Sequence, residues 1–348
     1  MIGEITNKLS NRTNLTYDEM ASAMEEILAG SVTTQESIAF LNSLTEKKET
    51  DEELLAMLDK MQEHAIHIMP KRTGKIIDVC GTGGDKMSTF NISTASAFVI
   101  AASDGSVAKH GNRSVSGTSG SADVFEYFGY DLNMEPKKIE DMIEKFGIGF
   151  MFAQKFHPAM KNISEARKAI GKRTAFNLLG PLCNPANVKN QLVGVFSKEY
   201  LTRIVELLKL HGSENIMTVI SEDGLDELST TAKNHICYFH KGEVITTILN
   251  PIEVGLSKAK LEDIQVLTKE QAILAFVKVL NGSASRPMIE TVALNSAAGL
   301  IVSELSNDFN DAVKKSLETI KSGKAYDLFK NFIREYGDIS KIEEIEKR

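Results

Sequence analysis

The chain has 348 residues, of which 42% are hydrophobic, and its formal net charge is -7 at pH 7. This length and composition are typical of a globular protein with roughly two domains. The acidic balance argues against nucleic acid as a partner, because nucleic-acid grooves are usually basic.

Cysteine usage and hydropathy exclude two further classes. The three cysteines lie far apart and lack metal-ligand spacing, so we expect no zinc site and no disulfide framework. The first residues lack the apolar core of a secretory signal, and no apolar stretch approaches the roughly 20 residues needed to span a bilayer. We therefore expect a cytoplasmic protein without membrane contact.

The N-terminal segment predicts a small helical domain. Thr-x-x-Glu capping boxes begin at Thr16, Thr33 and Thr50, and apolar residues at helical spacing follow each of them. No strand-like run interrupts these helices, and their short connections favour antiparallel neighbours. We expect this domain to cover residues 1–72.

After Lys75 the pattern changes to alternating strands and helices. A short apolar strand at 76–80 leads into a glycine-rich loop, a helix follows at 92–103, and a second strand at 106–109 leads into a polar loop. This order fits a βαβ unit with both loops at the carboxyl ends of parallel strands. Ligands of open α/β sheets bind at that edge.

The alternation continues and then breaks at a hairpin. The sequence predicts helix 122–128, strand 148–152, helix 157–170, strand 192–196, helix 198–211, strand 216–220, a hairpin of 236–239 with 244–248, and mostly helix from 268 to about 336.

One segment, residues 161–186, has no clear strand, so we expect it to join the helical domain. Residues 73–160 and 187–348 would then form an α/β domain with a mostly parallel central sheet and helices on both faces. A ligand would bind between the two lobes.

Glycines in the first loop are typical of a phosphate site. Gly81, Gly83 and Gly84 leave backbone N–H groups free to face an anion, and a helix N-terminus follows. Neither common template fits: Lys86 stands where a Rossmann fingerprint needs glycine, and Asp85 where a P-loop needs it. The loop therefore predicts anion binding of another kind.

The second loop, residues 109–123, combines cations, glycines and hydroxyls with little apolar content. Two such loops on adjacent strands indicate one ligand with two phosphate groups. The acidic turn 223–227 follows the strand ending at Ile220 and so opens onto the same edge. Neighbouring carboxylates that share an ion with ligand phosphates are typical of Mg²⁺ sites.

The remaining candidate is Arg167, whose planar guanidinium is suited to a substrate carboxylate. The sequence shows no nucleophilic triad, no HExxH helix and no pair of glycosidase carboxylates. This inventory favours positioning and charge stabilisation over covalent catalysis.

Motifs along most of the chain resemble the anthranilate phosphoribosyltransferase family. They are Gly81-Thr-Gly-Gly-Asp85, Asn91-Ile-Ser-Thr94, Lys109-His-Gly-Asn-Arg-Ser114, Arg173-Thr-Ala-Phe-Asn-Leu-Leu-Gly-Pro-Leu182 and Asp223-Gly-Leu-Asp-Glu227. The resemblance implies a helical domain joined to an α/β domain, and a homodimer formed through the helical domains. The chain departs from the common family residues at Thr118, Lys86-Met87 and Glu165.

The resemblance also implies a role for individual residues. Phosphoribosyl pyrophosphate would be bound by Gly81, Gly84, Asp85, Thr89, Asn91, Ser93, Thr94, Lys109 and Ser121. Anthranilate would contact Gly81, His110, Asn112 and Arg167. Magnesium, as two ions per site, would be bound by Ser93, Asp226 and Glu227.

The implied reaction transfers 5-phosphoribose to the amine of anthranilate, with Mg²⁺, and releases pyrophosphate, in tryptophan biosynthesis. Lys109 would stabilise the charge that develops, and His110 is a candidate for a late proton acceptor. No covalent nucleophile is expected. The sequence leaves open which loop binds the 5-phosphate and which the pyrophosphate.

Two alternatives remain. A pyrimidine nucleoside phosphorylase has a similar fold but would leave Arg167 and the Asp226-Glu227 pair without a purpose. A noncatalytic relative that binds nucleic acid is opposed by the acidic charge and the intact carboxylate pair.

Overall fold

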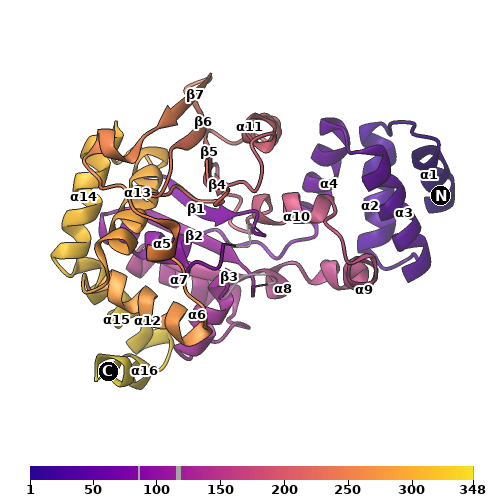
Figure 1. Ribbon diagram of the computed structural model, residues 1–348. Helices are drawn as coiled ribbons and strands as arrows, with labels where there is room; N and C mark the ends of the chain where they lie inside the picture. Colours follow the sequence, from indigo (N-terminus) through magenta and orange to yellow (C-terminus); the bar gives the residue numbers. More distant parts are fainter. Residues whose placement is uncertain (85–86, 115–118, 348) are drawn as a thin grey trace.

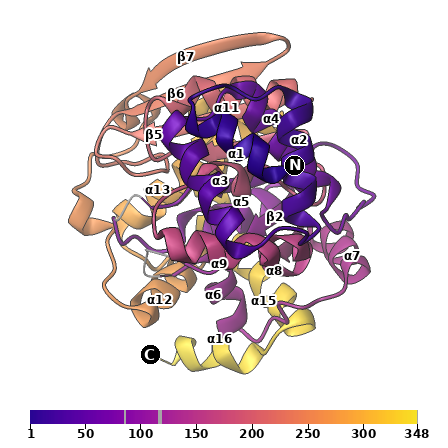
Figure 2. The same ribbon diagram turned by 90° about the vertical axis from the view of Figure 1, so that its right-hand side faces the viewer.

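The computed structural model describes residues 1–84, 87–114 and 119–347. A helical lobe stands beside a larger α/β lobe built on one sheet (Figure 1), and the view turned by 90° places the helices of the first lobe in front of that sheet (Figure 2). Within the described ranges, no helix is long and apolar enough to cross a membrane. The predicted fold class is confirmed.

The helical lobe begins with α1 (Ile2–Ser10), α2 (Tyr17–Leu28), α3 (Thr34–Lys47) and α4 (Asp51–Glu63). All three predicted capping boxes are present, at Thr16, Thr33 and Thr50. Helix α1 has no such box and was not predicted as a separate helix, although its apolar residues are buried at helical spacing.

A later segment packs against these helices. Helix α9 (Lys161–Ile170) lies against α2 and α3, and α10 (Ala175–Leu179) lies against α4 (Figure 1). The prediction of one helix over 157–170 was wrong at its start. Helix α8 (Ala153–Phe156) ends at His157, whose backbone is not helical (φ -121°, ψ 64°), and a 3₁₀ turn at Pro158–Met160 precedes α9. Proline disfavours a helical conformation in the residue before it.

The sheet of the α/β lobe has the order β3-β2-β1-β4-β5-β6-β7. The first five pair in parallel and the last two antiparallel. Their bounds are β1 (Ile76–Gly81), β2 (Ser106–Gly111), β3 (Ile148–Phe152), β4 (Asn190–Gly194), β5 (Asn215–Ser221), β6 (Asn234–His240) and β7 (Glu243–Leu249).

The predicted hairpin is confirmed as β6 and β7, joined at Lys241 and Gly242. Both turn residues have positive φ, 50° and 84°, as a two-residue turn of this kind requires. The strand expected at 192–196 lies earlier, at Asn190–Gly194.

Side chains of the strands alternate between two buried clusters on opposite faces of the sheet. In β1, Ile77 and Val79 belong to the cluster that includes α5 (Ile92–Ala102) and α13 (Arg286–Val302). Cys80 belongs to the second cluster, which includes α11 (Tyr200–Leu210) and continues through α10 into the helical lobe. One face of the sheet therefore shares its core with that lobe.

The remaining helices pack around the α/β lobe. They are α6 (Ser121–Tyr127), α7 (Pro136–Phe146), α12 (Lys269–Leu280), α14 (Phe309–Lys321), α15 (Lys324–Tyr336) and α16 (Ile339–Glu346), with 3₁₀ turns at Gly180–Leu182, Pro251–Val254 and Leu261–Asp263. Helix α7 was not predicted, although proline at its first position and Gly147 after its end are typical helix boundaries.

Candidate active site

The acidic turn passes directly over the carboxyl ends of two central strands. Gly81 at the end of β1 stands opposite Gly194 at the end of β4. A Cβ on Gly194 would lie 1.6 Å from the backbone oxygen of Asp226, and one on Gly81 would lie 2.8 Å from its Oδ2. Glycine at both strand ends leaves room for Asp226, for its backbone at Gly194 and for its carboxylate at Gly81. The structure therefore brings the first loop and this residue of the predicted metal pair together.

The first loop is held at several points. The Gly83 N–H donates to Oδ2 of Asp226 at 2.7 Å. The Thr82 N–H donates to Gly194 O at 2.9 Å, and its Oγ1 accepts from the Phe196 N–H at 3.1 Å. Gly83 and Gly84 have φ of +69° and +80°, which favour glycine. Asp85 and Lys86 lie outside the described residues.

The N-terminus of α5 connects the first loop with the second. The side chain of Asn91 caps this helix by accepting from the Thr94 N–H at 3.1 Å, and its Nδ2 donates to Ser119 O at 3.3 Å. The Thr94 hydroxyl donates to Oγ of Ser121 at 3.0 Å. Helix α6 begins at Ser121, so two helix N-termini, each suited to an anion, lie side by side.

Thr89 lies at the same edge of the sheet, but its contact is with the segment that precedes α12. It forms an isolated β-bridge with Gln265, whose Nε2 donates to Met87 O at 2.9 Å. The segment after the first loop is thus held by the chain that precedes α12.

A lysine and an aspartate are buried beneath the loops. The Nζ of Lys109 donates to Val79 O at 2.7 Å and to Ser93 Oγ at 3.2 Å. Asp78 is fully buried, and its carboxylate accepts from Asn184 Nδ2 at 2.7 Å and from the His110 N–H at 3.3 Å. The candidate catalytic residues of β2 are therefore fixed by the middle of β1.

Burial sets the direction of both pKa values. Burial raises the pKa of Asp78 to about 6, although Lys109, Asn184 and backbone N–H groups favour its charged form. Burial lowers the pKa of Lys109, against the carboxylates of Asp78 and Glu227 and the thiol of Cys80, which raise it. The ionisable groups of Asp78 and Lys109 are therefore close together in an environment from which water is largely excluded.

Two histidines lie side by side next to this pair. The rings of His110 and His157 have centroids 5.1 Å apart, and Nε2 of His157 lies 2.9 Å from Cys183 O. The Nε2 of His110 is buried and has no partner among the described residues. Burial, with the neighbouring His157 and Lys109, holds the pKa of His110 well below its usual range, so the ring is neutral near pH 7.

The polar loop after β2 contains side chains in different environments, some exposed to solvent and some paired with other residues. Asn112 is exposed, and its Oδ1 accepts from the Arg113 N–H at 2.8 Å. The guanidinium of Arg113 forms two hydrogen bonds to Glu126, at 2.5 and 2.6 Å, so its charge is already paired. Residues 115–118, which include the departure at Thr118, lie outside the described residues.

Arg167 comes from the other lobe, on α9. Its guanidinium lies over the ring of Phe176 at 5.4 Å, and burial alone lowers its pKa. No carboxylate of the described residues opposes this shift, which suits a residue that binds the carboxylate of a substrate. Glu165, the other departure on this helix, is exposed.

Four residues that were not predicted from the sequence also lie at this candidate site or contact its loops. They are Asp78, His157, Arg173 and Asn184. A charged residue in the middle of the apolar strand 76–80 was a usable signal for Asp78, because such a residue is rarely buried without a partner. Arg173 and Asn184 lay in or beside a motif whose members had no assigned role.

The oxygen donors fit magnesium. Asp226 and Glu227 offer adjacent carboxylates and Asp226 is buried, while the hydroxyl of Ser93 accepts from Lys109 Nζ at 3.2 Å. Across the described ranges, no group of three or more histidine, cysteine, aspartate or glutamate side chains could hold a metal. Mg²⁺ typically uses one or two protein carboxylates together with water and substrate phosphates, so a sparse donor set suits it.

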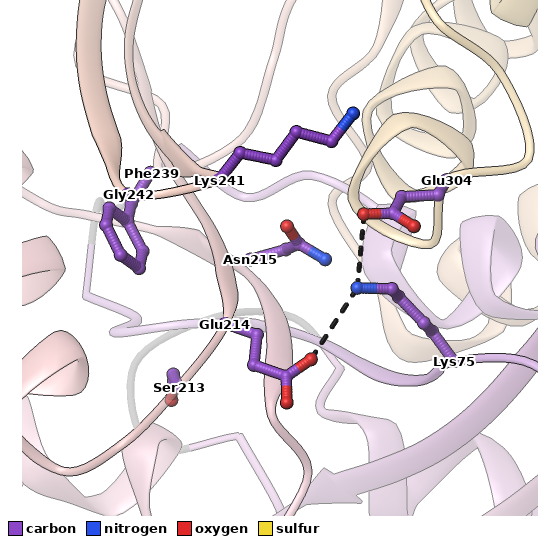
Figure 3. Close-up of a pocket in the computed structure, with 8 residues that line it drawn as sticks. All are labelled: Lys75, Ser213, Glu214, Asn215, Phe239, Lys241, Gly242 and Glu304. Atoms are coloured by element: carbon purple, nitrogen blue, oxygen red, sulfur yellow. Dashed lines mark ion pairs between the residues drawn. The ribbon is translucent and has the colours of Figure 1, made fainter.

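A pocket lies at the opposite edge of the sheet, where the parallel strands begin. It encloses about 390 Å³ and is lined in part by Lys75, Glu214, Lys241 and Glu304. Figure 3 shows the ammonium of Lys75 between two carboxylates, 3.6 Å from Glu214 and 3.1 Å from Glu304. The charges of this pocket neutralise one another.

Comparison with known proteins identifies the family. A model described as the helical bundle domain of a glycosyl transferase family matches residues 3–65, and one described as the a/b domain of that family matches 73–326. The chain therefore belongs to this glycosyl transferase family, whose two domains correspond to a helical bundle and an α/β fold.

Within this class the relatives are anthranilate phosphoribosyltransferases, and the chain belongs to that family. The protein of Nitrosopumilus maritimus is 60% identical over 345 residues, 99% of each chain, and that of Aquifex aeolicus is 38% identical over 96% of this chain and 98% of its own. The crystal structure of the Thermus thermophilus protein superimposes with a TM-score of 0.87 at 35% identity, over 94% of this chain and 98% of that one. The Saccharomyces cerevisiae protein in complex with PRPP and Mg has a TM-score of 0.87 at 25% identity, over 96% and 97%.

Proposed function

We infer that this chain transfers 5-phosphoribose from phosphoribosyl pyrophosphate to the amine of anthranilate, releasing pyrophosphate, in tryptophan biosynthesis. The observation that carries this inference is the carboxyl edge of the sheet. Two anion-binding loops meet there through Thr94 and Ser121, and the carboxylate of Asp226 lies against the first of them. The relatives named above, at up to 60% identity over the whole chain, support the same activity.

The donor half is proposed to be the glycine loop and the two adjoining helix N-termini. Gly81, Gly84, Asp85, Thr89, Asn91, Ser93, Thr94, Lys109 and Ser121 would bind phosphoribosyl pyrophosphate. The buried ammonium of Lys109 contributes most, because a fixed charge in a site without water stabilises a leaving pyrophosphate more strongly than a solvated one.

Magnesium would be held by Asp226, Glu227 and Ser93, and two ions per site remain part of the proposal. When bound, it supplies positive charge against the diphosphate. The chain itself contributes orientation. The Gly83 N–H fixes one oxygen of Asp226, which keeps this carboxylate directed across the ends of β1 and β4.

The acceptor half draws on both lobes. Arg167 from α9 would bind the carboxylate of anthranilate, while Gly81, His110 and Asn112 would approach it from the sheet. Such an arrangement would hold a weak amine nucleophile in line with the breaking bond, which is the main requirement when the leaving group is already good.

His110 is suited to accept the amine proton late in the reaction. The amine becomes strongly acidic only once its bond to ribose has formed, so a neutral imidazole of low pKa is a sufficient base. Its buried Nε2 has no partner in the described residues and so remains able to accept.

The division of the chain is a proposal as well. We assign residues 1–72 with 161–186 to one domain, and 73–160 with 187–348 to the other. The packing of α9 on α3 supports this division.

A homodimer through the helical lobe and a cytoplasmic location are further proposals. The second is supported by three buried cysteines that are free thiols.

The deciding experiment follows the fluorescence of anthranilate after phosphoribosyl pyrophosphate is added, with Mg²⁺ and with a chelator. We expect loss of the fluorescence only with Mg²⁺, and a much weaker response in Asp226→Ala. No loss in either condition would contradict the proposal. Phosphorolysis of a pyrimidine nucleoside that survives chelation would instead favour the phosphorylase alternative, and binding to nucleic acid at physiological salt would favour the noncatalytic one.

A further inference from the structure

An arginine of the segment between the lobes reaches the glycine loop. Arg173 lies between the end of α9 and the start of α10, and its Nη2 donates to Gly83 O at 3.0 Å and to Gly84 O at 2.9 Å. One nitrogen thus bonds two consecutive carbonyls of the loop proposed to bind the donor. Hydrogen bonds from a charged donor are stronger than those between neutral groups.

The residue at position 84 is matched to this contact. A Cβ on Gly84 would lie 2.0 Å from Nη2 of Arg173, and φ there is +80°. The positive φ favours glycine at this position, and a larger residue would in addition push the guanidinium away from the loop carbonyls.

The guanidinium is also held from its other side. Its Cζ lies 3.7 Å from the centroid of the Phe196 ring, a close cation–π contact. Phe196 itself donates its N–H to the Thr82 hydroxyl at 3.1 Å. Arg173, Phe196 and the loop therefore support one another, although Arg173 stands at the surface.

The direction of these bonds decides their effect. In a trans peptide the C=O and the following N–H point to opposite sides. Because Gly83 O faces Arg173, the Gly84 N–H of the same peptide unit faces away from it. By holding the Gly83 carbonyl on one side, Arg173 thus directs the Gly84 N–H to the other, as in backbone sites that bind anions.

The position of Arg173 in the chain adds a second consequence. Helix α9 ends at Ile170 and is followed by Gly171 with φ +63°, and Thr174 begins the capping box of α10. Arg173 is therefore separated from the end of one helix and the start of the next by only a short linker. The same helix α9 carries Arg167. A single short segment therefore contacts the donor loop and presents the residue proposed for the acceptor.

We propose that Arg173 is a positioning residue of the donor site, which orients the Gly83–Gly84 peptide so that its N–H faces the phosphates. This inference rests on the proposed function. It assigns Arg173 no contact with the reacting atoms.

The test compares Arg173→Ala, Arg173→Lys and the neighbouring control Lys172→Ala. Calorimetry measures binding of phosphoribosyl pyrophosphate with Mg²⁺, and steady-state kinetics gives KM for each substrate and kcat. We expect Arg173→Ala to weaken donor binding about tenfold or more, as for loss of charged hydrogen bonds. The KM for anthranilate at saturating donor should change much less. Arg173→Lys should recover part of the loss, and Lys172→Ala should match the unmodified chain.

A double-mutant cycle tests the route through the loop. Gly84→Ala should weaken donor binding strongly when Arg173 is present and less in Arg173→Ala, because the clash with Nη2 is then removed. Additive losses would overturn the proposal, as would unchanged donor binding or equal losses for both substrates in an active, folded Arg173→Ala. An unmodified chain without activity would count against the proposed function instead.

Discussion

The two edges of the central sheet carry similar charged residues under opposite conditions. At the amino edge, Lys75 lies between Glu214 and Glu304, and its hydrogen bond to Glu304 lowers the pKa of that exposed carboxyl. At the carboxyl edge, burial raises the pKa of Asp78 to about 6 and lowers that of Lys109.

The two edges differ in how far their charged groups are exposed to water. Exposed ion pairs at the amino edge are solvated and contribute little, whereas the carboxyl edge keeps charges in a dry setting where each acts strongly on a ligand. A hollow lined with charges is therefore weak evidence for a site. Buried charge beneath glycine loops is stronger evidence, because it costs stability and is rarely retained without a use.

The largest expected effect is at Lys109. Lys109→Met keeps the length of the side chain but removes the buried charge, and we expect kcat to fall by about 10²–10³-fold. Steady-state kinetics measures this. A decrease of less than about threefold would contradict the assignment of Lys109 to charge stabilisation.

The effect of Asp78 should appear in the dependence of stability on pH. Its folded pKa of about 6 lies above the ordinary 3.8, so the folded state binds the proton more tightly, and the protein loses stability as pH rises from about 4 to 6. Asp78→Asn lacks this loss. Urea unfolding should show the difference in unfolding free energy, variant minus unmodified chain, rising by up to about 3 kcal/mol over that interval and staying level above it.

A flat difference would mean that Asp78 is not held in a dry environment. Glu304→Gln at the amino edge is the control. The pKa of Glu304 is lowered by its hydrogen bond to Lys75, so the folded state binds the proton less tightly than the unfolded state. The difference for this variant should therefore change in the opposite direction as pH rises, and by less, because exposed ion pairs contribute little.

Arg167→Ala should mainly affect the acceptor. We expect KM for anthranilate to rise about tenfold, since a charge-assisted contact with a carboxylate is lost, while KM for phosphoribosyl pyrophosphate stays close to its original value. Unchanged kinetics with anthranilate would remove Arg167 from the acceptor half. The contrast with Arg173, whose loss should affect the donor, separates the two ends of one segment.

The smallest effect is expected at the amino edge. Lys75→Met should leave kcat unchanged and alter stability by less than about 1 kcal/mol, as for other exposed ion pairs. A loss of activity comparable with that of Lys109→Met would contradict the assignment of the active site to the carboxyl edge alone.

Local patterns in the sequence were enough for much of the fold. Capping boxes located α2, α3 and α4, and the turn at Lys241 and Gly242 located the hairpin. The start of α9 was missed because the effect of Pro158 on the residue before it outweighs the helical pattern.

The place of the candidate site was predictable from motifs at strand ends, because Gly81, Lys109 and Asp226 all lie at the carboxyl edge of the sheet. Contacts between distant segments were not. Nothing local indicates that Arg173 bonds Gly83, since that contact depends on how α9 crosses to the sheet. Likewise, Arg113 was counted among the cations of its loop, and only tertiary structure shows that Glu126 pairs with it.

The core shared by the two lobes has a practical consequence. Cys80, Cys183 and Cys237 are all buried in the cluster that runs from one face of the sheet through α10 into the helical lobe. The lobes cannot separate without exposing apolar surface on both, so they should unfold in one cooperative step. The three thiols then become reactive together, and the rate of their alkylation reports how often the joint between the lobes opens.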